Sequence, residues 1–286
     1  MLSDLLAIMD DQSSVLAPSP TALAAKTPTL KGIRAVVFDI YGTLFVSGAG
    51  DMSLAQQEDR EAAMLDVFAR EGLAVPEDCA LNATFHDLIK TAHEDSRAKG
   101  IDFPEAEIRE IWQKLLSGLG HEYDGALIER LSVRFETSVN PVWPMPRLAW
   151  TLRRIHQRED FTLGIVSNAQ FYTPLLFQHF LGKSTHDLGF DEELCIWSYQ
   201  ERIAKPSASL FAKLKSALAD RGIAPAESVY IGNDMRNDIV PAAAAGLRTA
   251  LFAGDQRSLR LRGHAPEKLP CDLILTRLDQ LPRCLA

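Results

Sequence analysis

Four short segments of the sequence carry polar side chains at or near the ends of apolar runs. The segments are IRAVVFDIYGT, FTLGIVSN, RIAKPSASLF and GNDMRND. Their candidate site residues are Asp39, Tyr41 and Thr43 in the first, Ser167 and Asn168 in the second, Lys205 in the third, and Asp234 and Asp238 in the fourth. A carboxylate can attack a substrate covalently, a lysine and a hydroxyl can stabilise the oxygens of a transferred group, and paired acids can hold Mg²⁺.

Each of these segments also has a simple structural explanation when it is taken alone. An Asp that follows a strand often forms a turn, and Ser-Asn is a common turn pair. A lysine before a proline is usually a surface residue, and acids four residues apart can cap and solvate a first helical turn. The combination is more informative, because an acid, a hydroxyl, a lysine and an acid pair follow each other with complementary roles.

The elements that would position these residues alternate between strands and helices. Apolar runs predict strands at 33–39, 161–168, 228–234 and 248–255, and their continuous hydrophobicity is typical of strands covered on both faces. Helical stretches at 207–222 and 237–246 separate the later strands. We therefore predict an α/β fold with a doubly wound parallel-sheet (Rossmann-like) core domain, in which ligands bind outside the carboxyl ends of the strands.

The interval between the first two predicted strands is longer than a crossover connection needs. Apolar residues recur in it at three- and four-residue steps, which predicts helices at 51–72, 81–98, 104–119 and 122–139. Glycines in VSGAG and prolines in NPVWPMP supply hinges on either side. We predict an inserted helical cap domain at 47–142, a core domain made of 31–46 and 143–286, and a flexible tail at 1–30 whose first turns can dock as a helix.

The motifs DIYGTLF, VSN, AKP and GND, the last with its acid at 238, resemble the four ordered motifs of the haloacid dehalogenase superfamily. The resemblance spans roughly residues 33 to 255. It implies that Asp39 is a covalent nucleophile and that Ser167 and Lys205 bind the transferring group. It also implies that Asp234 and Asp238 hold Mg²⁺, as the fourth motif does in phosphotransferring members. The long insertion is similar to the cap of that family, which closes over the substrate.

Tyr41 occupies the position where phosphatases of this family usually carry a second Asp. That acid protonates the leaving alcohol and then activates water. A phenol, with an unperturbed pKa of about 10, can donate a proton but is a poor base at neutral pH. The dehalogenating members have Asp-x-Tyr-Gly-Thr, as in this sequence, and a leaving halide needs no proton. Tyr41 taken alone therefore favours the hydrolysis of a small 2-haloacid.

The fourth motif favours a phosphatase. Dehalogenases of the family work without a metal and lack the metal-binding acid in this motif, whereas this sequence has Asp234 and Asp238. Three carboxylates that converge on one lysine would repel each other unless a cation lay among them. We therefore predict Mg²⁺ held by Asp39, Asp234, Asp238 and the backbone carbonyl of Tyr41, with Asn233 as the weaker alternative to Asp234.

The preferred prediction is a hydrolase with a covalent aspartyl intermediate, acting as a Mg²⁺-dependent phosphatase on a small phosphorylated metabolite. A metal-free 2-haloacid dehalogenase is the first alternative. A slow or inactive binding protein with the same fold is the second, which rests on fold analogy. The predicted catalytic residues are Asp39, Ser167, Lys205 and Tyr41, and the predicted substrate-binding residues are Thr43 and Asn168.

Composition limits the partners of the chain. The formal net charge of −8 gives no overall attraction to nucleic acid or anionic lipid, so we expect a small anionic substrate, no nucleic acid and no membrane partner. The N-terminal apolar run LLAIM is too short to span a bilayer, and four cysteines without paired spacing fit a reducing cytoplasm. Arg257, Arg260 and Arg262 form a basic run that is either a solvated edge or an anion site. The sequence does not indicate an oligomeric state.

Overall fold

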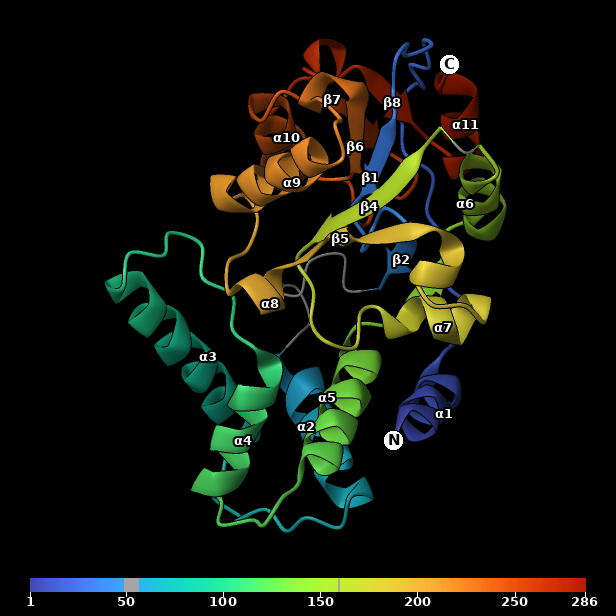
Figure 1. Cartoon of the computed structure of the whole chain (residues 1–286). Coiled ribbons are helices and arrows are strands. Elements are labelled where there is room, and N and C mark those ends of the chain that lie inside the picture. The colour runs from blue at the N-terminus through green and yellow to red at the C-terminus, as the bar shows by residue number, and fades with distance from the viewer. Residues whose placement is uncertain (49–56, 159) are drawn as a thin grey trace.

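A computed structural model describes residues 1–48, 57–158 and 160–286 of the chain. Its centre is a six-stranded parallel sheet with the order β5-β4-β1-β6-β7-β8. The strands are β1 Ala35–Phe38, β4 Thr162–Ser167, β5 Phe190–Trp197, β6 Ser228–Gly232, β7 Arg248–Phe252 and β8 Leu273–Leu275. Helices lie on both faces of this sheet (Figure 1), which confirms the predicted doubly wound, Rossmann-like α/β fold.

The four strands predicted from the sequence are the four central ones. All residues of β1 are buried, as are nearly all those of β4, β6 and β7, because helices cover both faces. The two edge strands, β5 and β8, were not predicted. β5 carries the acids Asp191, Glu192 and Glu193, which interrupt its apolar pattern, and β8 has only three residues.

Two hydrophobic cores pack against the opposite faces of the sheet. Val36 and Phe38 of β1 face the core that contains α6 (Leu148–His156) and α7 (Leu175–Leu181). Ala35 and Val37 face the core that contains α9 (Ala208–Asp220) and α10 (Val240–Ala244). The alternation follows from strand geometry, in which successive side chains point to opposite faces. A last short helix, α11, covers Leu281–Cys284.

A separate group of helices, which we call the helical unit, is inserted between β2 (Phe45–Ser47) and β3 (Val142–Pro144). Its described members are α2 Gln57–Arg70, α3 Leu81–Ala98, α4 Ile108–Gly118 and α5 Gly125–Val139. They pack around Trp112, whose ring lies 4.9 to 6.2 Å from the rings of Phe68, Phe85 and Phe135. We call the part of the chain that contains the six-stranded sheet and the helices on its faces the sheet domain. Figure 1 shows the helical unit below it.

Antiparallel pairing of β2 with β3 joins the two chain segments that enter and leave the helical unit. The structure has the helix predicted at 81–98 with the same ends, and the helices predicted at 104–119 and 122–139 start a few residues later. For the helix predicted at 51–72, the first residues lie outside the described part of the chain, as does the end of the VSGAG hinge.

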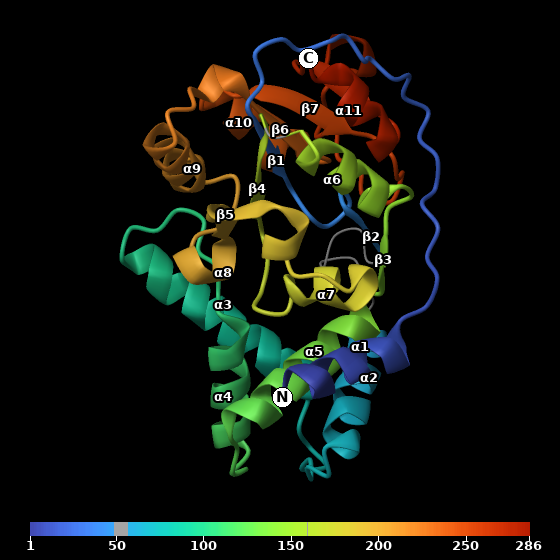
Figure 2. The same ribbon diagram turned by 45° about the vertical axis from the view of Figure 1, so that its right-hand side comes forward.

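The N-terminal segment is packed along the molecule, whereas the sequence predicted a flexible tail with a docked first turn or two. Helix α1 (Leu2–Gln12) buries Leu5, Ile8 and Met9, and it contacts α5 and α7. Residues after α1 follow the sheet domain, where the Thr21 hydroxyl donates to the Ala253 carbonyl oxygen at 2.7 Å. Figure 2 shows this path, which ends at β1. The apolar residues of LLAIM give α1 a single face that can be buried.

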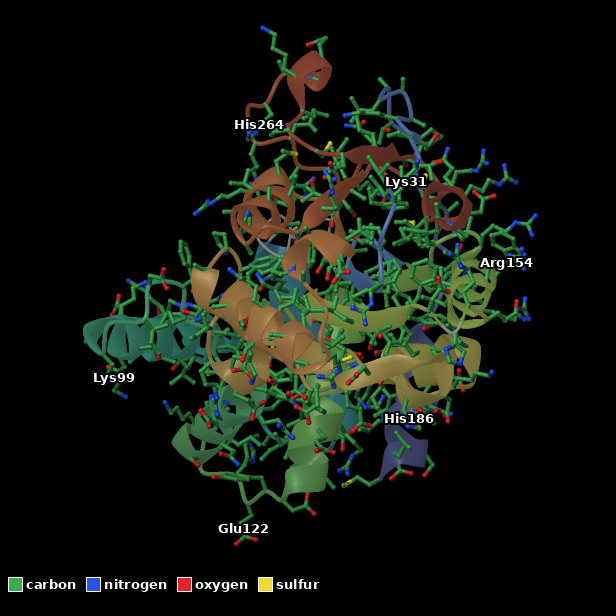
Figure 3. The ribbon with its side chains drawn as sticks, turned by 45° about the horizontal axis from the view of Figure 1, so that its top comes forward. Lys31, Lys99, Glu122, Arg154, His186 and His264 are labelled. Carbon is green, nitrogen blue, oxygen red and sulfur yellow. The ribbon has the colours of Figure 1, made fainter. Side chains whose placement is uncertain are left out.

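Charged side chains gather at the outside of the molecule. Figure 3 shows Lys99, Glu122 and Arg154 pointing away from the ribbon, as expected for groups that water solvates. Within the described ranges, no helix has both the length and the apolar character that a membrane crossing requires.

Candidate active site

The predicted site residues meet at the carboxyl edge of the sheet. Asp39 follows β1, Ser167 ends β4, and Asp238 lies in a π-helical turn (Met235–Ile239) just after β6. Because β4, β1 and β6 are parallel neighbours, their carboxyl ends lie side by side. A cavity of about 290 Å³ opens at this edge, and it is lined by Asp39, Tyr41, Asn168, Lys205, Asp234 and Asp238 among others.

Asp39 is held by its backbone and by two side-chain donors. Its N–H donates to the carbonyl oxygen of Ile231 at 2.8 Å, which continues the pairing of β1 with β6. Its Oδ1 accepts hydrogen bonds from the Ser167 hydroxyl at 2.9 Å and from Lys205 Nζ at 2.7 Å. The side chain is only 9% exposed, so the carboxylate has a fixed position at the end of a buried strand.

Lys205 lies between two carboxylates. Its Nζ is 2.7 Å from Asp39 Oδ1 and 2.6 Å from Asp238 Oδ1, and it also donates to the Tyr230 hydroxyl at 3.2 Å. Burial opposes the charge of Lys205, but the attraction of Asp238 and Asp39 outweighs it and raises the lysine pKa. Burial raises the pKa of Asp238 to about 6, although Lys205 acts in the opposite direction.

The second oxygen of Asp238 is also bonded. Asp238 Oδ2 accepts the backbone N–H groups of Asn233 at 3.1 Å and Asp234 at 3.0 Å. Gly232 makes this approach possible, because a Cβ at that position would lie 2.4 Å from Asp238 Cγ. Both carboxylate oxygens of Asp238 therefore have protein donors.

Gly42 forms the turn after the nucleophile candidate. Its φ of 79° lies in the left-handed region, and a Cβ there would lie 2.5 Å from the Ser258 Cβ. The turn sets Thr43 so that its hydroxyl donates to Asn233 Oδ1 at 3.1 Å. Thr43 is fully buried behind the cavity wall, so its predicted contact with substrate stays a prediction.

Asp234 is turned away from Lys205. Its Oδ1 accepts the N–H groups of Arg236 and Asn237, which caps the π-helical turn, and its Oδ2 lies 2.7 Å from Arg262 Nη2. Arg262 reaches this point because the loop before it pairs with the fourth motif. The Met235 N–H donates to the Arg260 carbonyl oxygen at 2.9 Å.

Asn168 and Tyr41 line the cavity, and each is also bonded to protein. Asn168 Oδ1 accepts the backbone N–H of Lys205 at 2.7 Å, which orients the loop that carries the lysine. The Tyr41 hydroxyl shares a hydrogen bond of 3.1 Å with the Thr173 hydroxyl. Burial, and then the charge of Glu136, raise the pKa of the phenol far above its ordinary value. Tyr41 therefore keeps its proton at neutral pH.

The predicted metal ligands do not converge on one point. Asp39 and Asp238 face Lys205, while Asp234 faces Arg262. Within 1–48, 57–158 and 160–286, no three Asp, Glu, His or Cys side chains are grouped so that they could hold a metal ion. The Mg²⁺ site predicted from Asp39, Asp234, Asp238 and the Tyr41 carbonyl oxygen stays a prediction. The three carboxylates instead have two protein cations, and the sequence had suggested only one.

Two residues of the cavity had no sequence signal strong enough to single them out. Arg262 belongs to the basic run that the sequence left open as a solvated edge or an anion site. Arg260 and Arg262 line the cavity, whereas Arg257 pairs with Asp255. Glu105 belongs to no motif, yet it lines the cavity from the helical unit. Burial raises the pKa of Glu105 to about 7, against a hydrogen bond from Ser198.

A parallel Rossmann-like domain with an inserted helical unit and an acid–lysine pair at the sheet edge is an architecture found among hydrolases that use an aspartate nucleophile. The family model of the haloacid dehalogenase-like hydrolases matches residues 33–246, and the chain belongs to that family. This confirms the resemblance read from the four motifs. A search of curated proteins found no match.

Solved structures with the same fold include both dehalogenases and a phosphatase. The chain is similar to a 2-haloacid dehalogenase from Pseudomonas syringae pv. tomato DC3000, at 21% identity and a TM-score of 0.54 over 88% of this chain and 97% of that one. It is also similar to a defluorinating L-2-haloacid dehalogenase (19%, TM-score 0.51, 88% and 94%) and to a HAD phosphatase from Thermococcus onnurineus (18%, TM-score 0.50, 88% and 97%). Identities this low show the fold and do not separate the two activities.

Proposed function

We propose that this hydrolase uses Asp39 as a covalent nucleophile and removes halide from a 2-haloacid without a metal. The observation that carries the proposal is the charge pairing in the cavity, where Lys205 bridges Asp39 and Asp238 and Arg262 pairs with Asp234. The sequence favoured a phosphatase because three carboxylates around one lysine called for a metal cation. Arg262 supplies a second protein cation, so a metal is no longer needed to balance these carboxylates.

In the first step, Asp39 would attack the carbon that carries the halogen. Ser167 and Lys205 both donate to Oδ1, so we assign the attack to Oδ2. A carbon–oxygen bond forms as the carbon–halogen bond breaks, and the halide leaves with the bonding electrons. No proton is needed for this leaving group, which agrees with a buried Tyr41 that holds its proton. Water then hydrolyses the ester and restores Asp39.

The cavity also has groups that suit the carboxylate of a haloacid. Arg260 and Arg262 line it together with Lys205. Arginine presents several N–H donors in one plane and binds carboxylates well. A cation near the reacting carbon would also attract an anionic substrate into a cavity that is otherwise rich in acids.

The second candidate is the Mg²⁺-dependent phosphatase of a small metabolite. It is favoured by the fact that Asp39, Tyr41, Asp234 and Asp238 line one cavity. Arg262 would first have to leave Asp234, and Tyr41 could not serve as the base, so we rank it below the dehalogenase.

Halide release from 2-chloropropionate, measured with and without EDTA, tests the proposal. We expect release that EDTA does not change, and a loss of about 10⁴-fold or more in Asp39→Asn. Hydrolysis of p-nitrophenyl phosphate that requires Mg²⁺, without halide release, would overturn the first candidate in favour of the second. A folded protein that turns over neither compound would support a binding role.

A further inference from the structure

A short segment between α3 and α4 crosses from the helical unit to the loop that carries Lys205. The Ala204 N–H donates to the Phe103 carbonyl oxygen at 2.7 Å, and the Glu105 N–H donates to the Arg202 carbonyl oxygen at 3.1 Å. We call residues 103–107 the crossing segment. Its backbone bonds hold Glu105 next to the sheet domain, although Glu105 belongs to the inserted part of the chain.

The Glu105 carboxylate is oriented by two uncharged donors. The fully buried Ser198 hydroxyl donates to Oε2 at 2.8 Å, and Gln170 Nε2 donates to Oε1 at 3.3 Å. Gln170 is itself fixed, because its Oε1 accepts the N–H of Ile108 at the start of α4. Glu105 and Asp39 line the same cavity. The crossing segment thus presents a further oriented carboxylate to the space where the substrate would lie.

Hydrolysis of an ester on Asp39 needs a group that takes a proton from water. Tyr41 cannot accept one, because its phenol is already protonated. Asp238 has its oxygens occupied by Lys205, Tyr230 and two backbone N–H groups. Glu105 is different, since its side-chain donors Ser198 and Gln170 are uncharged, whereas Asp238 is paired with the cation Lys205. Burial brings the pKa of Glu105 to about 7, where a carboxyl group can both accept and return a proton at neutral pH.

The other titratable groups of the helical unit that face this cavity are already paired. Glu136 accepts hydrogen bonds from Tyr172 at 3.1 Å and from Asn140 at 2.9 Å. Burial raises the pKa values of both Glu136 and Tyr172. A negative Glu105 would therefore face a neutral phenol in Tyr172. Arg60 of the helical unit lines an adjoining cavity with Glu105, and Lys205, Arg260 and Arg262 line the cavity of Asp39.

We propose that Glu105 is the general base that activates water in the second half of the reaction, an inference that rests on the proposed function. Glu105 takes a proton from water as the water oxygen bonds to Cγ of the Asp39 ester. The bond between Cγ and the product oxygen then breaks. Glu105 returns its proton to that oxygen, which leaves as the hydroxyl of a 2-hydroxyacid. Asp39 is left as a carboxylic acid, and it releases its proton to solvent.

The test follows Glu105→Gln with 2-chloropropionate by halide release and by intact-protein mass. We expect about one equivalent of halide in a rapid burst, followed by turnover at least about 100-fold slower than wild type. The protein should gain the mass of one carboxyethyl group. Glu105→Asp keeps the carboxyl group and should recover part of the turnover, which guards against a folding defect in the glutamine variant.

Glu110→Gln is the matched control. Glu110 pairs with Arg202 on the exposed side of the same crossing, and it does not line the cavity. Its turnover should stay within about twofold of wild type, since exposed ion pairs contribute little. Equal steady-state turnover in wild type and Glu105→Gln would overturn the role of Glu105 and leave the proposed function standing. Absence of halide release and adduct in the wild type would overturn the proposed function and this role with it.

Discussion

The sheet edge and the crossing segment bring carboxylates to one cavity in different ways. Asp39 and Asp238 sit at or beside strand ends, and each has the ammonium group of Lys205 within 2.7 Å. Glu105 sits on irregular backbone, and its side-chain donors Ser198 and Gln170 are uncharged. A neighbouring cation favours the charged, nucleophilic form of a carboxylate, whereas burial among neutral donors favours proton exchange. In our proposals, Asp39 at the sheet edge attacks the substrate and Glu105 on the crossing segment transfers the proton.

Removing the cation at the sheet edge should have the largest effect. Lys205→Met leaves Asp39 and Asp238 buried without their partner, and breaking such a pair costs about 3 to 5 kcal/mol. We expect that loss in the free energy of unfolding measured with urea, together with loss of activity. Lys213→Met, which removes the exposed pair with Glu201, is the control and should change little. A loss below about 1 kcal/mol in Lys205→Met would contradict the charge pairing described here.

The next largest effect is expected in the pH dependence of turnover, which should report the ionisation of Glu105 on the crossing segment. If Glu105 must be ionised to accept a proton, kcat should fall about tenfold per pH unit below a midpoint near its pKa of about 7. Stability should change in the opposite direction. The folded chain holds this proton more tightly than the unfolded chain, so ionisation of Glu105 costs stability as the pH rises from about 4.5 to about 7. The difference in the free energy of unfolding between wild type and Glu105→Gln should therefore grow between about pH 4.5 and pH 7 and stay constant above pH 7.

The smallest effect is expected from removal of Arg262, the cation that pairs with Asp234. Arg262→Gln removes a partly exposed ion pair, so its effect on stability should be slight. We expect KM for 2-chloropropionate to rise about fivefold, while kcat changes little, because the arginine binds the carboxylate in both ground and transition states. The exposed Arg236→Gln, in the same motif, is the control. An unchanged KM in Arg262→Gln would remove Arg262 from substrate binding.

The parts of the fold and site that the sequence could predict are those with local signals. The central strands have continuous apolar runs, and the motif residues follow their ends. Arg262 and Glu105 could not be predicted, because each reaches the cavity through backbone pairing between distant residues, Met235 with Arg260 and Phe103 with Ala204. The sequence therefore undercounted the protein cations at the site, and the metal that it predicted on that count stays a prediction.

Helix α1 has a mechanical consequence. It contacts α5 of the helical unit and α7 of the sheet domain, and the chain after it is hydrogen-bonded to Ala253, which follows β7. The two parts of the molecule cannot swing apart unless α1 is lifted from one of them. The first residues of the chain thus fasten the helical unit to the sheet domain at a point outside β2 and β3, where the chain itself passes between the two parts.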